Sequence, residues 1–220
     1  MKTIWCADSA SKAYIETIKS VKPSHYPSLT SSFEESNVAE LLSAMAAGSK
    51  SQMIVEAWAS GTDVATSIGL SIASSHTRGR HVCVVQDERS RLEYLDAICE
   101  AGVVSPPDVV VGEAEEVMGG LPAVDFLVVD CRRKDYAKVL RCAKVSQRGA
   151  VLVCKNASPR AIPTFRWRNV IGSGARVVRS AFLPVGKGLE MAQVSLGSVN
   201  KNRWIRHIDR RTGEEHMFRI

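Results

Sequence analysis

Five short, mostly apolar runs, separated by segments long enough to form helices, constrain the fold of this chain most strongly. Such runs do not alternate between apolar and polar residues, and strands of this kind belong in a sheet that is covered on both faces. Strands that are linked through helices form right-handed parallel units. The sequence therefore predicts an α/β fold with a parallel sheet. The runs are QMIVEAW (52–58), HVCVV (81–85), DVVV (108–111), VDFLVVD (124–130) and AVLVC (150–154).

The end of the chain departs from this alternation of strands and helices. Residues 175–185 (ARVVRSAFLPV) and 188–196 (GLEMAQVSL) have the composition of two further strands, and only Gly186 and Lys187 separate them. So short a connection requires antiparallel pairing. We therefore expect a seven-stranded, mostly parallel sheet that ends in an antiparallel hairpin, with helices on both faces.

The first fifty residues predict helices rather than strands. Ser11–Val21 and Ser36–Ala47 carry apolar residues at helical spacing, and the Pro- and Ser-rich stretch 22–32 between them has the composition of a loop. We expect residues 1–48 to form a helical segment packed on the same domain as residues 49–197. Residues 198–220 then form a basic C-terminal tail.

Composition argues against a membrane protein and against a metal or disulfide framework. No stretch approaches the ~20 consecutive apolar residues that cross a bilayer, and no apolar run follows Lys2 as in a secretory signal. We expect a cytoplasmic protein, with the nucleus as an open alternative. No CxxC motif or zinc-ligand spacing occurs, so the cysteines are expected to be reduced thiols. They are Cys6, Cys83, Cys99, Cys131, Cys142 and Cys154.

The formal net charge is +6, and part of it lies in the stretch VNKNRWIRHIDRR (199–211). A basic stretch that contains a tryptophan could bind a nucleic acid. The favoured interpretation is a solvated terminal strand or tail, because no known nucleic-acid-binding motif accompanies the charge. A nucleic-acid partner is therefore the less favoured interpretation.

Acidic residues follow four of the five parallel strands. In an open α/β sheet, ligands bind outside the carboxyl ends of the strands. Carboxylates there would accept hydrogen bonds from ribose hydroxyls and an adenine amino group, and would offset a sulfonium charge. Each acid alone could instead cap a helix. Together they indicate S-adenosylmethionine as cofactor, and the residues are Glu56, Asp87 or a neighbour, Glu113 and Asp130.

The loop after the first strand has an unusual composition for a nucleotide-binding loop. Such loops need glycines where the backbone approaches the ligand. Here Gly61 is the only glycine, and Trp58 occupies the turn. The indole could stack on an adenine or could simply fill the cleft, and the sequence leaves both interpretations open.

Five motifs between Ser36 and Leu196 resemble those of caffeoyl-CoA O-methyltransferases and their catechol O-methyltransferase relatives. This resemblance implies a Rossmann-like class I methyltransferase fold, S-adenosylmethionine as cofactor and a homodimer. The whole chain is even more similar to a plant family described only as methyltransferase-like. The motifs are Glu56 with Gly61, Glu100–Val103 (EAGV), Gly112–Ala114 (GEA), Val128–Asp130 (VVD) with Tyr136, and Leu183–Gly188 (LPVGKG).

The same resemblance implies a divalent-metal site that this chain has altered. In these relatives an Asp after the fourth strand and an Asp-Asn pair after the fifth hold the metal. Asp130 and Asn156 match the first and the last of these ligands, but Lys155 stands where the middle Asp is expected. An ammonium replaces an oxygen ligand with a positive charge. We therefore expect no metal, and Lys155 could pair with Asp130 in its place.

Three functions remain open from the sequence. The first is a metal-independent O-methyltransferase with Lys155 as general base, acting on a small anionic acceptor. Basic residues around the expected acceptor site favour an anion. The second is a catalytically inactive methyltransferase-fold module with a binding or regulatory role, and the third is nucleic-acid binding through the basic tail. The basic residues of the expected acceptor site are Arg132, Arg133, Lys155 and Lys187.

Overall fold

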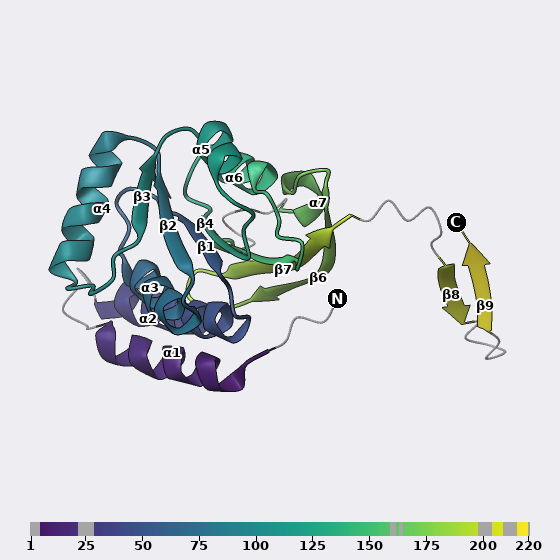
Figure 1. Cartoon of the computed structure of the whole chain (residues 1–220), viewed down its shortest axis with the longest axis horizontal. Helices are drawn as coiled ribbons and strands as arrows, with labels where there is room; N and C mark the ends of the chain where they lie inside the picture. The colour runs from purple at the N-terminus through teal and green to yellow at the C-terminus, as the bar shows by residue number, and fades with distance from the viewer. Residues whose placement is uncertain are drawn as a thin grey trace.

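The computed structural model describes residues 5–21, 29–158, 162, 165–197, 204–208 and 215–219. A seven-stranded sheet with the order β3-β2-β1-β4-β5-β7-β6 forms its centre (Figure 1). The first five strands pair in parallel, and β7 pairs antiparallel with both β5 and β6. The predicted fold class is thus confirmed. The strands are β1 Met53–Ala57, β2 Arg80–Val85, β3 Asp108–Val111, β4 Phe126–Asp130, β5 Ala150–Lys155, β6 Ala175–Leu183 and β7 Leu189–Leu196.

Helices cover both faces of this sheet, as Figure 1 shows. On one face α2 and α3 pack on the sheet, α1 packs against both of them, and α4 covers β2 and β3. On the opposite face lie α5, α6 and α7. We refer to these as the α3 face and the α6 face. The helices are α1 Ala7–Ser20, α2 Leu29–Gly48, α3 Ala65–Thr77, α4 Glu88–Glu100, α5 Ala114–Gly120, α6 Tyr136–Cys142 and α7 Trp167–Val170.

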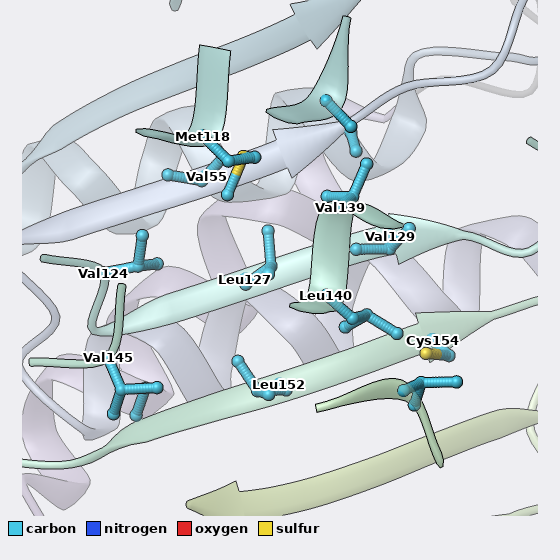
Figure 2. Packing of buried hydrophobic residues seen from close by; sticks show 14 of the residues in the cluster. Val55, Met118, Val124, Leu127, Val129, Val139, Leu140, Val145, Leu152 and Cys154 are labelled. Atoms are coloured by element: carbon cyan, nitrogen blue, oxygen red, sulfur yellow. The ribbon is translucent and has the colours of Figure 1, made fainter. Parts of the chain in front are cut away.

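The α6 face shows why the apolar strands fit this architecture. Alternate residues of β1 and β4 point to it, such as Val55 and Leu127, where they meet Met118 of α5 and Leu140 of α6 (Figure 2). The other residues of the same strands, such as Ile54 and Phe126, lie in a second buried cluster on the α3 face. Because both sets are buried, a polar residue at every second position would be buried on one face or the other. These strands are therefore apolar throughout.

Several helices differ from the prediction: α1 begins at Ala7 instead of Ser11, and the four-residue helix α7 was not predicted. Helix α2 begins at Leu29 instead of Ser36, so residues 29–32 are helical where a loop was expected, while residues 22–28 lie outside the described residues. Serine and threonine disfavour helix interiors only weakly, whereas proline ends a helix, and the last proline of this stretch is Pro27. Helix α5 was not predicted, because its sequence AEEVMGG is short and ends in two glycines.

Part of the C-terminal stretch expected to be a tail forms a two-stranded antiparallel sheet. Its strands are β8 Trp204–Ile208 and β9 Glu215–Arg219. All six cysteines are free thiols, as predicted, and Cys83 and Cys154 are buried. Among the residues that the structure describes, no helix is long and apolar enough to cross a membrane.

Candidate functional site

The strand register brings Glu56, Asp130 and Lys155 to the α3 face of the sheet. Glu56 of β1 lies beside Val128 of β4, and Asp130 of β4 lies beside Lys155 of β5. Since side chains alternate along a strand, Val128 and Asp130 share one face, and their neighbours share it with them. All three charged side chains are buried there, near the first turn of α3. The sequence placed these residues at one sheet edge, and the structure brings them together.

The Asp130 carboxylate is fully occupied by side chains and backbone of this chain. Arg132 donates to it from its backbone N–H at 2.9 Å and from Nη2 at 2.9 Å. Asn156 Nδ2 lies 3.0 Å from both carboxylate oxygens, and Lys155 Nζ lies 3.9 Å from Oδ2. Burial raises the pKa of Asp130, but the bonds from Arg132 and the charge of Lys155 outweigh it. The pKa therefore lies below its ordinary value.

These contacts do not fit a divalent metal. A hard cation takes several oxygen ligands that no other cation has neutralised. Here the candidate ligands Asp130 and Asn156 are bonded to each other, and Arg132 and Lys155 already supply positive charge to Asp130. The Lys155–Asp130 pair that the sequence suggested is present. Lys155 Nζ also donates to Thr66 Oγ1 of α3 at 3.1 Å, and Lys155 is only 2% exposed.

Glu56 lies at the centre of a buried polar cluster beneath α3. Its Oε2 accepts a hydrogen bond from Ser67 Oγ at 2.6 Å and lies 3.8 Å from His81 Nε2. Burial raises the pKa of Glu56 to about 7, despite the charge of Lys155 and the bond from Ser67. Burial likewise lowers the pKa of His81 to about 3, and its Nδ1 pairs with Ser71 Oγ at 3.1 Å. A carboxyl so deep in the protein is held by the core rather than presented to a ligand.

The loop after β1 is closed by Trp58. The indole is 1% exposed, packs edge-on against Tyr94 of α4 with ring centroids 5.3 Å apart, and donates from Nε1 to the Asp63 carbonyl at 3.2 Å. Of the two interpretations left open by the sequence, the structure shows the filling one. The backbone N–H of Gly61, whose φ is +75°, donates to Glu93 Oε1 of α4 at 2.7 Å. The loop is therefore tied to α4.

Arg133 crosses the edge of the sheet where β1, β2 and β4 end. Its guanidinium forms two hydrogen bonds with the Asp135 carboxylate, at 2.9 and 2.8 Å. Its remaining nitrogen, Nη1, donates to the carbonyl oxygens of Trp58 at 2.8 Å and Val84 at 3.0 Å. The side chain is 0% exposed. The sequence placed Arg133 among the basic residues around an acceptor, and only its spacing to Asp135 hints at this buried position.

The two remaining predicted acids are exposed at the ends of β2 and β3. Asp87 caps α4 by accepting from the Ser90 backbone N–H at 2.7 Å, a bond that lowers its pKa. Glu113 occupies the N-cap position of α5 without a capping bond from its side chain. Of the four cations expected around an acceptor, Arg133 and Lys155 are buried, while Arg132 and Lys187 are exposed. The basic surface at this edge is therefore smaller than predicted.

The carboxyl ends of β1 and β4 leave little room for S-adenosylmethionine. The cofactor needs open space along the ends of β1 and β4 and free acceptors for its donors. That space holds the buried side chains of Trp58 and Arg133. The Asp130 carboxylate and Glu56 Oε2 have partners within the chain, and Glu56 Oε1 is buried without a hydrogen-bond partner among the described residues. Asp87 and Glu113 remain accessible. The β1–β4 end thus does not fit the cofactor as it stands, whereas the β2–β3 end has exposed acceptors.

Comparisons with known proteins support the fold but do not identify a reaction that this chain catalyses. A family model described as "Protein of unknown function (DUF1442)" matches residues 1–220. No curated protein matches the chain. A methyltransferase from Geobacter sulfurreducens has 21% identity and a TM-score of 0.54, over 71% of this chain and 78% of that one. An O-methyltransferase from Bacillus cereus, solved with SAH, has 17% identity and a TM-score of 0.52, over 86% and 91%.

A third similar structure carries the methyl donor itself. The O-methyltransferase TomG from Streptomyces achromogenes, in complex with SAM, has 20% identity and a TM-score of 0.51, over 87% of this chain and 92% of that one. At such identities the likeness establishes a Rossmann-like methyltransferase fold for this chain. Activity has to be argued from the residues of the site.

Proposed function

We propose that this chain, which belongs to the DUF1442 family, is a methyltransferase-fold binding module without metal-dependent methyl-transfer activity. Its own side chains occupy the end of the sheet where this fold holds cofactor and metal. The module then acts through ligands or partners bound elsewhere. Such a role is consistent with the fold, because one fold can host unrelated functions and the function depends on the site that the residues form.

The single observation that carries the proposal is the position of Arg133. Its guanidinium bonds to the Trp58 and Val84 carbonyls and to Asp135 in the absence of any solvent exposure. A cofactor entering here would have to displace it, which leaves Asp135 and two carbonyls without this donor. Breaking a buried pair by removing one member costs about 3–5 kcal/mol. Such a penalty lowers cofactor affinity by roughly 100- to 4,000-fold.

The exposed acids at the ends of β2 and β3 favour one second candidate. Asp87 and Glu113 are accessible on adjacent strands, where they could accept hydrogen bonds from an adenosine. In this candidate the chain is a metal-independent S-adenosylmethionine-dependent O-methyltransferase for a small anionic acceptor, with Lys155 as base. Displacement of Arg133 would have to precede binding. If Lys155→Gln left methyl transfer to an identified acceptor unchanged, Lys155 would have no part in proton transfer.

A thermal-shift titration separates the two candidates. S-adenosylmethionine or its demethylated product would be added to the full chain, with and without magnesium. A ligand at a hundred times its Kd stabilises a protein by about 2.7 kcal/mol, which for a domain of this size raises Tm by about 5–10 °C. The binding-module proposal predicts no saturable shift. A saturable shift that Glu113→Ala abolishes would contradict it and support the second candidate.

A further inference from the structure

A cavity of about 250 Å³ opens on the α3 face, beside the antiparallel end of the sheet. It lies away from Asp130 and Lys155, which are the last residues of β4 and β5. Its strand residues come instead from the amino-terminal end of β5, at Val151, and from the middle of β6 and β7. The C-terminal half of α2 and the chain before α1 form its other walls. Six of its lining residues carry the argument: Trp5, Met45, Val151, Arg179, Ala181 and Met191.

Trp5 is held as one wall of this cavity by a specific contact with the end of α2. Three atoms of its indole ring lie 2.4–2.6 Å from the position that a Cβ on Gly48 would occupy. The backbone N–H of Cys6 also donates to the Gly48 carbonyl at 2.8 Å. Only glycine at position 48 therefore lets the indole lie in this place. Although Trp5 is 55% exposed, its ring is held in one position beside the cavity by its packing against Gly48.

A β-bulge places Arg179 on the same wall. Val177 pairs with Val194 of β7, whereas Arg179 pairs with the preceding Gln193, so the register shifts by one residue at Val178. Without that shift, residues 177 and 179 would share the α6 face, where Val177 packs. The bulge instead brings Arg179 to the side of Gln193, together with Val151 and Met191. Bulges commonly re-aim a side chain in this way.

Arg179 gives the cavity a charge that its other walls lack. The described residues provide no ion pair or hydrogen bond to its guanidinium. Met45, Val151, Ala181 and Met191 contribute apolar surface around it. An aliphatic or aromatic body would be buried against these residues, and methionines adapt readily to its shape. A guanidinium at such a cavity selects a carboxylate, which it can bind through two parallel hydrogen bonds.

We propose that this cavity is a binding site for a small monocarboxylate with an apolar body. A cavity of about 150 Å³ accommodates benzene, which has six non-hydrogen atoms. By proportion, this cavity accommodates a ligand of about ten non-hydrogen atoms, the size of octanoate. The carboxylate pairs with Arg179, the chain packs on Met45, Val151 and Met191, and the Trp5 ring covers it. This site is separate from the methyltransferase-like end and does not depend on its state.

Tryptophan fluorescence of the full chain, titrated with octanoate, tests the proposal. Saturable binding should change the emission, and Trp5→Phe should remove most of that change. Arg179→Gln should weaken octanoate binding about tenfold or more, which corresponds to the loss of one charge-assisted contact. Arg176→Gln is the matched control on the same strand, since Arg176 is exposed but does not line the cavity. It should change the affinity less than about twofold, well within the scatter expected of a surface charge.

Two further measurements use an uncharged ligand and a variant in which a larger side chain fills the cavity. Octan-1-ol should bind the wild type and Arg179→Gln equally, because it has no carboxylate. Ala181→Phe should abolish binding of both ligands while the chain remains folded, as judged by its unfolding midpoint. The proposal is overturned if octanoate shows no saturable binding, or if Arg179→Gln and Arg176→Gln behave alike. A sedimentation result showing a dimer that excludes octanoate would also overturn it, since a second copy would then cover the cavity.

Discussion

The buried guanidinium of Arg133 forms an ion pair with the mostly buried carboxylate of Asp135 through two hydrogen bonds, Nε to Oδ1 at 2.9 Å and Nη2 to Oδ2 at 2.8 Å. The pair fixes the guanidinium plane so that Nη1 reaches the carbonyl oxygens of Trp58 and Val84. A loop after β4 is thereby bonded to the ends of both β1 and β2. This one side chain and the indole of Trp58 together fill the ends of β1 and β4.

Arg133→Ala should destabilise the protein much more than Arg132→Ala, although the two residues are neighbours. Removing Arg133 takes both side-chain donors from the mostly buried Asp135 carboxylate and one donor from the Trp58 carbonyl, at a cost of about 3–5 kcal/mol. The Val84 carbonyl keeps its bond from the Trp58 backbone N–H. The Arg132 side chain is 41% exposed, and Asp130 keeps its bonds from Asn156 and from the Arg132 backbone. Its loss should cost about 1 kcal/mol. Urea unfolding of both variants measures the difference, and equal costs would contradict the account.

Trp58→Ala should lower the free energy of unfolding by about 3–5 kcal/mol, because a large buried aromatic leaves a cavity behind. The variant also lacks the edge-on contact between the indole and Tyr94 and the hydrogen bond from Nε1 to the Asp63 carbonyl. Trp58→Phe keeps much of the volume and should cost less. If chemical unfolding showed that Trp58→Ala is as stable as the wild type, the ring would not be filling the cleft.

Glu56→Gln should alter how stability depends on pH. The folded-state pKa of Glu56 is raised to about 7. In the unfolded chain Glu titrates near 4.3, so the unfolded state releases its proton first as pH rises. The wild type therefore loses stability between about pH 4.3 and 7, by up to about 4 kcal/mol. The gain in stability of Glu56→Gln over the wild type should grow through this window, as followed by urea unfolding at several pH values.

His81→Asn should change the pH dependence in the opposite direction. The folded-state pKa of His81 is lowered to about 3 by burial, whereas an unfolded histidine titrates near 6.5. As pH falls below 6.5, the unfolded chain binds a proton that the folded chain does not. From pH 6.5 to 5 the wild type should lose about 2 kcal/mol through this residue. Urea midpoints that fall equally steeply in His81→Asn would show that His81 is not held neutral.

Much of the fold was predictable from the sequence because both faces of the sheet are buried. That burial imposes uninterrupted apolar strands, and such runs as HVCVV and AVLVC stand out in any sequence. The hairpin followed from the short connection at Gly186 and Lys187. The start of α2 was mispredicted because composition is a weak indicator of where a helix begins. Helix α5 was not predicted, because seven residues are too few to show a periodic apolar pattern.

The candidate site was predictable in its residues but only partly in their roles. Glu56, Asp130 and Lys155 were placed together from their positions at strand ends, and the Lys155–Asp130 pair followed from charge. The buried position of Arg133 depends on which loops meet over the sheet, which local sequence does not encode. The same holds for Arg179, whose direction depends on a one-residue bulge at Val178.

Calorimetric titration of the full chain with S-adenosylmethionine, with and without magnesium, tests the central claim most directly. Because Trp58 and Arg133 fill this end of the sheet, we expect no binding tighter than a Kd of about 1 mM in either condition. That Kd corresponds to a binding free energy of about −4 kcal/mol. Magnesium should make no difference, because Asp130 is already bonded to Arg132, Asn156 and Lys155. Micromolar binding to the wild type would contradict the account and show that the end opens to the methyl donor.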